Sequence, residues 1–481
     1  MGKDLRGFLK QLQSTGETTI TIEREVQPTD FEVTAILRRL EERALFPLVL
    51  FNHCRNVKGE LSNVKIISNV FATRERCAVA LDLPLTRSGI DLTFRYSERA
   101  KNLIEPCIVP KKDARVKEVV KKGSDLDLSD YPLVRHHEMD PAPYIDMVTC
   151  HKGRGKQFYN TAFQRNMYKG PQKLGLFMAS RHNWEICRTY EVEGEPSPVI
   201  IIIGHHPAFY LGTLNIQPYG VDDYRVIGGL MNEPLSLVES ETWGRDFLVP
   251  ADAEAVIEGE VLPNVREAEG PFGEWPGYYG PQRLSWVIDL KAITHRRDAI
   301  WQDVFVSHRE NWILGGVPKE GEIFEAVRAY VPTVKSVHFP FSGDCRLFCY
   351  ISIDKQEEGD AKQAALIALG TCDFIKYVVV VDADVDPFNE GEVLWAVATR
   401  CQPSEDIEVI RNVKTSPLDP SILGQSEGSK MIIDATIPKR RSFAVRTQVP
   451  QRVLDHVTLE DYIGQTELLS IPKHTDSLRS V

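Results

Sequence analysis

The sequence predicts a multidomain α+β protein with an N-terminal α/β region, a central domain built mostly of β-strands and a C-terminal α/β domain. The chain has 481 residues, and two or three domains are expected at about 150 residues each. Hydrophobic residues make up 42% of it, which is enough to fill a core in each domain. The spacing of these residues changes character twice along the chain, which places the domains at residues 1–120, 121–315 and 316–481.

The N-terminal region alternates helix and strand patterns. Apolar residues recur at helical spacing in residues 30–43, which follow a predicted N-cap at Thr29 and Asp30. We expect helices at 3–14, 30–43 and 74–81 and strands at 18–22, 46–51 and 64–70. A lysine-rich stretch at residues 111–122 then places the domain boundary between residues 110 and 130.

The two later domains differ in their patterns. Short strand patterns separated by Gly and Pro indicate a β-barrel or sandwich, with strands at 198–204, 256–261 and 284–293. Val317-Pro318 then precedes a helix predicted at 320–330, which starts the third domain. That domain is predicted to contain strands at 335–339, 347–353 and 377–381 and helices at 361–369 and 392–400.

Composition restricts the class of partner. The formal net charge of −11 gives no global positive field that would attract nucleic acid or an anionic membrane. Residues 1–13 lack the apolar core of a signal peptide, and the longest apolar runs, such as Val199–Ile203, have the length of strands. We therefore expect a soluble, cytoplasmic protein that binds a small molecule. The nine cysteines are scattered and odd in number, which favours reduced core thiols over a disulfide framework.

The segment from Glu267 to Tyr279 is the most informative part of the sequence. It carries three carboxylates within eight positions, at Glu267, Glu269 and Glu274, among Gly, Pro and aromatic residues. Gly and Pro predict an irregular turn, and aromatic neighbours exclude water. Carboxyl groups in such a place can acquire separated pKa values, which general acid catalysis near neutral pH requires. A surface loop with solvated acids is the alternative.

A second group of residues has the chemistry of a metal site. If residues 160–165 form a strand, their odd spacing puts Asn160 and Arg165 on opposite faces unless a bulge intervenes. An amide oxygen of Asn160 and an imidazole nitrogen of His182 are ligands that Mn²⁺ or Mg²⁺ accepts, with a nearby carboxylate. The alternative for His182 is a hydrogen-bonded surface residue. The sequence contains no P-loop, dinucleotide fingerprint or G-x-S-x-G motif.

Four elements in this order resemble the UbiD family of reversible decarboxylases. They are Glu269-Gly-Pro-Phe-Gly-Glu274, the Asn160-x4-Arg165 pair, the downstream His182, and the strand from Val378 to Asp386 with Trp395 to Arg400 after it. Their order and approximate spacing agree over nearly the whole chain with ferulic acid, hydroxybenzoate and protocatechuate decarboxylases. The resemblance implies a central split β-barrel that binds prenylated FMN and a C-terminal domain that mediates dimerisation.

The resemblance also implies an activity and catalytic residues. The activity is non-oxidative decarboxylation of an aromatic, heteroaromatic or α,β-unsaturated carboxylic acid through a covalent adduct with prenylated FMN. Arg165, Glu269 and Glu274 match the family's Glu-Arg-Glu network, in which Glu274 donates the proton that replaces CO₂.

Metal and cofactor ligands follow in the same way. Asn160 and His182 match Mn²⁺ ligands, and Asp223 stands where the family usually has Glu, with Asp222 as the alternative. Phe158, Gly212 and Thr213 fall where relatives bind K⁺ (or Na⁺). The predicted cofactor-binding residues are Asn160, Thr161, Ala162, Phe163, Gln164, Arg165, Arg181, His182 and Asp223. Lys376 or Lys430 is a candidate to neutralise the cofactor phosphate.

The substrate pocket is predicted to include Arg181, His308, Arg309 and Leu314, and the pair His308 and Arg309 favours an acid with a second polar group. Alternatively, Arg309 pairs with Glu310 or another surface acid. Expected partners are the substrate, a flavin prenyltransferase that supplies the cofactor, and further copies of the chain in a homodimer or higher homo-oligomer. Two other functions stay open: a flavin-dependent reductase of split-barrel type, and a non-catalytic subunit of a larger carboxylase assembly.

Overall fold

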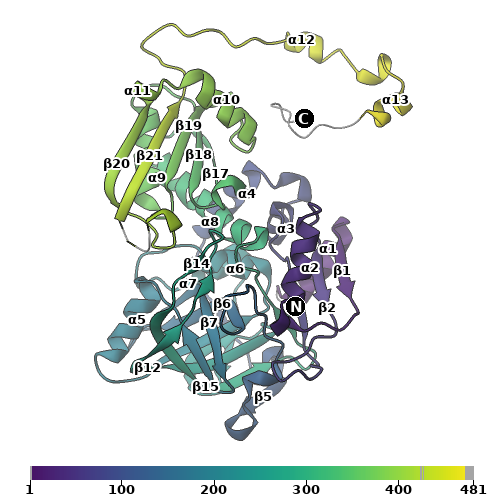
Figure 1. The fold of residues 1–481 in the computed structure, drawn as a ribbon, viewed down its shortest axis with the longest axis vertical. Coiled ribbons are helices and arrows are strands. Elements are labelled where there is room, and N and C mark those ends of the chain that lie inside the picture. The colour runs from purple at the N-terminus through teal and green to yellow at the C-terminus, as the bar shows by residue number, and fades with distance from the viewer. Residues whose placement is uncertain (1–2, 423–424, 426, 472–481) are drawn as a thin grey trace. The chain divides into compact units, whose positions relative to one another are not determined.

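The structure is a computed structural model that describes residues 3–422, 425 and 427–471 (Figure 1). It contains two compact units. The first comprises Met1–Glu325, Phe341–Arg346 and Ser416–Glu427, and the second comprises Ala326–Pro340, Leu347–Thr415 and Gly428–Val481. The predicted multidomain α+β class is confirmed by the sheets described below. The predicted domain boundaries stay predictions. The boundary between the first two domains falls inside one compact unit, which holds both the N-terminal sheet and the barrel.

The described helices of the first unit are α1 (Leu5–Thr15), α2 (Glu32–Glu41), α3 (Arg74–Ala80), α4 (Ile90–Ala100), α5 (His182–Glu191), α6 (Pro207–Thr213) and α7 (Asp223–Met231). Helix α8 (Arg309–Arg328) leads into the second unit. The described helices that follow are α9 (Asp360–Thr371), α10 (Glu390–Arg400), α11 (Pro403–Asp406), α12 (Gln451–Leu454) and α13 (Gln465–Ser470).

The N-terminal sheet has the order β1-β2-β3-β16. Its strands are β1 (Thr19–Ile22), β2 (Leu48–Phe51), β3 (Lys65–Ser68) and β16 (Ile300–Gln302). Helix α1 begins because the Asp4 side chain accepts the Gly7 N–H, and it ends at Gly16 with φ +80°. The predicted strands and helices of this region are confirmed, and the sequence pattern missed α4.

The beginning of α2 differs from the prediction. Residues Pro28–Asp30 form a 3₁₀ turn, and Phe31 occupies the N-cap position with φ +67° and no side-chain cap. Thr29 and Asp30 therefore do not cap this helix. The Glu32 side chain accepts the N–H of Gln27 at 2.6 Å and so ties the start of α2 to the residue before the turn.

A closed antiparallel barrel forms the centre of the first unit. Its strands pair in the order β12-β9-β6-β7-β8-β15, and β15 pairs with β12 to close the ring. The barrel strands are β6 (Tyr144–Lys152), β7 (Tyr159–Gly170), β8 (Lys173–Leu176), β9 (Ser197–Ile203), β12 (Ala255–Glu269) and β15 (Arg283–His295). The other strands of this unit are β4 (Cys107–Ile108), β5 (Val119–Lys122), β10 (Ser236–Ser240), β11 (Gly244–Pro250), β13 (Phe272–Gly273) and β14 (Tyr279–Gly280).

Two sequence predictions need correction. Strand β12 continues through Glu267 to Glu269, because its ladder with β15 supplies backbone partners as far as the pair Glu269 and Arg283. Helix α8 runs from Arg309 through Pro318 instead of starting after it. Buried Ile313, Leu314, Val317 and Ile323 on both sides of the proline stabilise the helix against the lost hydrogen bond.

The second unit is α/β, as predicted. Its sheet has the order β17-β18-β19-β21-β20, with strands β17 (Val334–His338), β18 (Phe348–Ile353), β19 (Tyr377–Asp382), β20 (Ile407–Lys414) and β21 (Glu427–Ala435). Helix α10 packs its buried Val393 and Ala396 against Val379 and Val381 of β19. Asn389 starts this helix, since its side chain accepts the Glu392 N–H.

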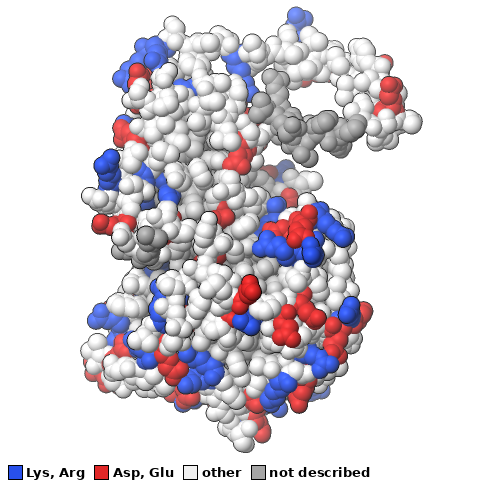
Figure 2. Space-filling view, in the orientation of Figure 1, with Lys and Arg blue, Asp and Glu red and all other residues white. Residues whose placement is uncertain are grey.

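Surface and thiol properties agree with the composition. On the face shown in Figure 2, acidic and basic side chains are interspersed without a large patch of one sign. Seven of the nine cysteines are buried, as expected for core thiols. Among the described helices, none combines the length and the apolar character needed to cross a membrane.

Candidate active site

Arg165 lies at the centre of the predicted catalytic network, in β7, where its side chain is 5% exposed. Its Nε donates to Oε1 of Glu269 and its Nη2 donates to Oε2, each at 2.9 Å, so the guanidinium binds this carboxylate as a fork. Its Nη1 donates to Oε1 of Glu274. The structure therefore brings together the three residues predicted to carry the chemistry, and Glu267 stays outside, paired with Lys169 and Lys173.

Aromatic side chains enclose this network. The guanidinium carbon of Arg165 lies 4.1 Å from the ring centre of Phe177 and 4.9 Å from that of Phe272. The Tyr144 hydroxyl donates to Oε1 of Glu269 at 3.1 Å. Burial and the neighbouring Glu269 carboxylate raise the pKa of Tyr144 above its ordinary value. Because water is excluded, the ion pairs are stronger than they would be at a surface.

Glu274 is held in a short hairpin formed by β13 and β14. Its N–H donates to the Tyr278 carbonyl at 2.9 Å. Gly280 faces its side chain, because a Cβ at Gly280 would lie 3.2 Å from Cγ of Glu274. Gly270, with φ +84°, turns the chain out of β12 toward this hairpin. Glycines on both sides therefore allow the acid to approach Arg165.

Strand β7 has an open edge beside this network. Strand β6 pairs with β7 along residues 159–167, whereas β8 joins the opposite edge only from Asn166 onward. At the start of this edge, the N–H of Tyr159 donates to Asp222 at 3.2 Å and the N–H of Thr161 donates to Asp223 at 2.6 Å. The N–H of Phe163 points the same way, because strand residues alternate. This stretch of β7 includes the predicted cofactor-binding residues from Asn160 to Gln164, and at Arg165 the carbonyl accepts the N–H of Phe177 at 3.3 Å.

Two of the predicted metal ligands, Asn160 and His182, meet at the start of the same edge. Oδ1 of Asn160 lies 3.2 Å from Nδ1 of His182, which is the first residue of α5. Burial, together with the neighbouring Arg181, lowers the pKa of His182, which favours the neutral imidazole that metals bind. Nδ2 of Asn160 donates to Asn183, so its carbonyl oxygen is the atom that faces His182.

Asp223 contacts Thr161, the residue of β7 that follows Asn160. Its Oδ2 accepts both the N–H and the hydroxyl of Thr161, at 2.6 and 3.0 Å. Burial raises its pKa to about 7, so a nearby cation would stabilise the carboxylate. Oδ1 of Asp222 instead accepts the N–H groups of Tyr159 and Tyr224, each at 3.2 Å, and caps α7.

The donor set fits a hard divalent cation. Among the described residues, no three His, Cys, Asp or Glu side chains gather into a metal-binding cluster, so a metal site requires another type of donor. Asn160 supplies an amide oxygen, His182 an imidazole nitrogen and Asp223 a buried carboxylate. Such a set with open positions suits Mn²⁺ or Mg²⁺.

The residues predicted for a monovalent cation have structural contacts of their own. Gly212 packs against α7, where a Cβ would lie 2.9 Å from Cα of Ile227. The hydroxyl of Thr213 donates to the Tyr210 carbonyl at 2.8 Å. The ring of Phe158 covers Gly153. A role in binding K⁺ stays a prediction for these residues.

Of the predicted pocket residues near the start of α8, His308 is buried and Arg309 is half-buried. His308 stacks on Phe305 with ring centres 4.9 Å apart, and burial lowers its pKa to about 3. The guanidinium of Arg309 donates to the Ala72 carbonyl and lies between the rings of Phe46 and Phe341. The Glu310 carboxylate accepts the N–H groups of Asn69 and Phe71, and among the described contacts the Arg309 guanidinium bonds to the Ala72 carbonyl and not to Glu310.

Lys430 has a structural environment in the second unit. Its buried ammonium donates to the carbonyls of Leu369, Cys372 and Asp373 at 3.3–3.4 Å, at the C-terminal end of α9. This is a helix cap rather than a phosphate site, so the phosphate role proposed for Lys430 is not supported. The ammonium of Lys376 lies 5.6 Å from the ring centre of Tyr377, and its phosphate role stays a prediction.

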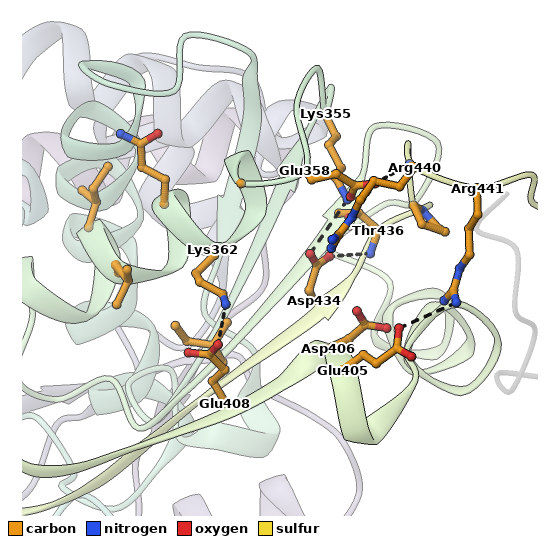
Figure 3. A pocket seen from close by; sticks show the side chains of 16 residues that line it. Lys355, Glu358, Lys362, Glu405, Asp406, Glu408, Asp434, Thr436, Arg440 and Arg441 are labelled. Atoms are coloured by element: carbon orange, nitrogen blue, oxygen red, sulfur yellow. Dashed lines mark hydrogen bonds and ion pairs between the residues drawn. The ribbon is translucent and has the colours of Figure 1, made fainter.

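A cavity of about 960 Å³ in the second unit contains none of the predicted site residues (Figure 3). It lies beside α9, β20 and β21. Opposite charges pair within it, including Lys355 with Glu358 at 2.8 Å and Arg441 with Glu405 at 3.7 Å. The charged side chains that line the cavity are therefore of both signs, and most of them pair with one another.

Comparison with known proteins identifies the family. Residues 9–95, 108–309 and 313–435 match the N-terminal, Rift-related and C-terminal domains of 3-octaprenyl-4-hydroxybenzoate carboxy-lyase, the UbiD family. Anhydromevalonate phosphate decarboxylase of Methanothermobacter thermautotrophicus is 33% identical over 435 residues, which cover 90% of this chain and 97% of that protein. Phenolic acid decarboxylase of Sedimentibacter hydroxybenzoicus is 30% identical over 450 residues, 91% of this chain and 92% of that protein.

Comparison with solved structures points to the same family. HmfF of Pelotomaculum thermopropionicum, in complex with FMN, is 34% identical with a TM-score of 0.87, and the match covers 96% of this chain and 100% of that chain. An evolved dimeric form of HmfF in complex with prFMN has a TM-score of 0.84 at the same identity and coverage. The chain belongs to the UbiD family, and it is a carboxy-lyase.

The residues that surround the Arg165 network and hold its hairpin were not predicted from the sequence. Tyr144, Phe177 and Phe272 reach Arg165 from three different strands or loops, and Asp140 reaches the hairpin from a loop before β6. The only available signal was the aromatic content of the Glu267–Tyr279 segment, which included Phe272 alone of these four.

We expect the Arg165 fork to be a large contributor to stability. Replacing Arg165 with Met leaves Glu269 and Glu274 buried without their cation, which lowers the free energy of unfolding by about 3–5 kcal/mol at pH 7. At pH 5 the deficit becomes smaller, because unpaired buried carboxyl groups take up protons. Urea unfolding of the wild type and the variant at pH 7 and pH 5 measures the difference in the free energy of unfolding.

The matched control is Arg245→Met, which removes an exposed arginine paired with Glu239. We expect no measurable change in the free energy of unfolding of that variant. Equal losses in the two variants would contradict a buried, water-excluded network at Arg165.

Proposed function

We propose that this carboxy-lyase binds prenylated FMN and catalyses reversible, non-oxidative decarboxylation of an aromatic, heteroaromatic or α,β-unsaturated carboxylic acid. The open edge of β7 is the observation that carries the proposal. Asn160 and Arg165 are five residues apart on a regular strand, or about 17 Å at the usual rise. That spacing suits an elongated phosphate-bearing flavin, with its anionic end at the metal ligands and its reactive end at the acid network.

Relatives support the cofactor and the substrate class. HmfF holds prFMN, and similar proteins are decarboxylases of phenolic acids, gallate and anhydromevalonate phosphate. A reductase needs no acid network, and a non-catalytic subunit has no need of a buried Glu-Arg-Glu arrangement. Both alternatives are therefore disfavoured.

Asn160, His182 and Asp223 would hold Mn²⁺ against the cofactor phosphate, and the region of Phe158, Gly212 and Thr213 would hold K⁺ or Na⁺. A separate flavin prenyltransferase would supply the cofactor. The exposed apolar residues of the C-terminal segment, such as Val445 and Leu469, support assembly of a homodimer or higher homo-oligomer. When bound, prenylated FMN supplies the electron sink for loss of CO₂.

The chain's own residues would orient the catalytic carboxyl groups and donate one proton. The Arg165 guanidinium holds the Glu269 carboxylate as a fork and orients Glu274 through its remaining Nη1 donor. Glu274, in its protonated form, donates to the carbon from which CO₂ has departed, and that carbon's electron pair forms the new C–H bond. Phe177, Phe272 and Tyr144 exclude water, so this proton comes from Glu274.

The cofactor proposal is tested by producing the protein with and without a co-expressed flavin prenyltransferase. We expect a prenylated flavin, identified by absorbance and intact cofactor mass, only in the co-expressed sample supplied with Mn²⁺ and K⁺. The loaded protein should then release CO₂ from members of a carboxylic acid panel. Unmodified FMN or no flavin in both samples would overturn the proposal.

Glu274→Gln should retain the cofactor and lose turnover by a factor of about 10² or more, because an amide cannot donate the proton. Glu267→Gln is the matched control, since Glu267 lies on the same segment but pairs with Lys169 and Lys173 outside the network. We expect the control to keep turnover within about 2-fold of the wild type. Near-normal turnover of Glu274→Gln would remove Glu274 as the donor.

Asp223→Asn should weaken Mn²⁺ binding by at least about 10-fold, because it removes the charge of the site's buried carboxylate. Asp222→Asn is the comparison, and it keeps the oxygen that caps α7. Bound manganese, measured by elemental analysis after dialysis, reports the difference. If Asp222→Asn lost the metal and Asp223→Asn kept it, Asp222 would be the ligand.

A further inference from the structure

The hairpin that carries Glu274 is held by the loop before β6, which contains Asp140. Asp140 is fully buried, and its Oδ1 accepts the N–H of Gly273, the residue before Glu274, at 3.0 Å. Its Oδ2 accepts the N–H of His137 at 2.9 Å. Both carboxylate oxygens are therefore occupied by backbone donors, one on each side of the contact.

Two further contacts bind the same loop to the same hairpin. The N–H of Met139 donates to the hydroxyl of Tyr279, which pairs with Gly273 across the hairpin, at 3.1 Å. The His137 ring packs against Gly273, since a Cβ at Gly273 would come within 2.2 Å of Nδ1 of His137. Side-chain bulk at position 273 would therefore push the hairpin away from the loop.

The loop itself is anchored by a buried charge cluster. His136 lies between two acids, with Nε2 3.0 Å from Oδ1 of Asp303 and Nδ1 3.2 Å from Oδ2 of Asp146. The two carboxylates raise the pKa of His136, which favours the imidazolium between them. Asp146 pairs across β6 and β7 with Arg165, so the anchor and the catalytic arginine lie on the same face of the same two strands.

We propose that Asp140 is a positioning residue for Glu274. It ties the hairpin to the anchored loop, so that the distance of Glu274 from Arg165 and from the reacting carbon is set by the barrel and not by the flexibility of a two-stranded turn. A misplacement of about 1 Å in a proton donor lowers the rate by up to about 100-fold. The contact between Asp140 and the hairpin therefore affects the rate, although Asp140 does not touch the substrate. The inference rests on the proposed role of Glu274 as the proton donor.

The test compares Asp140→Asn with wild type in the cofactor-loaded enzyme. An asparagine can accept through only one oxygen, so one of the two backbone donors loses its partner. We expect kcat to fall about 10-fold, KM to stay within about 2-fold, and the solvent isotope effect on kcat to rise because proton transfer becomes slower. The flavin-to-protein ratio should equal that of the wild type.

A crystal structure of Asp140→Asn provides a readout independent of activity. We expect the Glu274 carboxylate to be displaced from Nη1 of Arg165, with the barrel unchanged. Tyr279→Phe is a second variant that keeps the half-exposed ring and removes one fastening contact, and its kcat should fall about 3-fold. Asp127→Asn is the matched control, because Asp127 also accepts a backbone N–H in a short turn but does not contact the hairpin.

The outcomes separate this inference from the proposed function. Unchanged kcat and an undisplaced Glu274 in Asp140→Asn overturn the inference. A loss of kcat that only follows an equal loss of bound flavin also overturns it, because the role would then be structural. If wild-type enzyme decarboxylates no acid, the proposed function fails, and the position of Glu274 in the variant still decides whether Asp140 sets it.

Discussion

The burial of two carboxylates beside one guanidinium is the constraint on which the site depends. Taking Glu269 and Glu274 out of water is costly unless each keeps a charged hydrogen-bond partner. Arg165 meets that requirement only if β7, β12 and the β13–β14 hairpin are held in fixed register, because a fork is directional. The closed barrel supplies that rigidity through the β6–β7 and β12–β15 ladders. The stability of the barrel and the geometry of the acid network are therefore linked.

Much of this arrangement could be predicted from the sequence, and the failures have physical causes. Periodicity placed most helices and strands, because amphipathic patterns are local. It failed at Phe31, where an uncapped left-handed residue starts a helix, and at Pro318, where tertiary burial outweighs a lost hydrogen bond. The irregular structure expected through Glu267 was wrong because a strand ladder with β15 overrides local composition. Tyr144 and Asp140 were missed since only the fold brings them to the network.

The odd spacing of Asn160 and Arg165 places the predicted metal ligand and the predicted catalytic arginine on different faces of one strand. The β6–β7 pairing continues without a bulge from Tyr159 to Met167, so the two side chains do lie on opposite faces. On an edge without a neighbouring strand, this is an advantage: side chains from both faces and backbone N–H groups between them approach the same line. Under the proposed function, a cofactor lying along that line would contact His182 and Asn160 at one end and the acid network at the other.

The structure distinguishes residues that belong to buried charge networks from residues that pack among aromatic rings. The predicted metal ligands and the acid network lie on β7 or hydrogen-bond to it, and a change at Arg165, Glu269 or Asp223 would disturb a buried charge. The predicted pocket residues His308 and Arg309 lie instead at the start of α8, and Phe305, Phe46 and Phe341 surround them. Aromatic packing tolerates changes of shape at a smaller cost than unpaired buried charge. Under the proposed function, substrate preference would therefore change more readily at this aromatic layer than at the strand edge, because a change among the aromatic rings leaves the buried ion pairs of Arg165 intact.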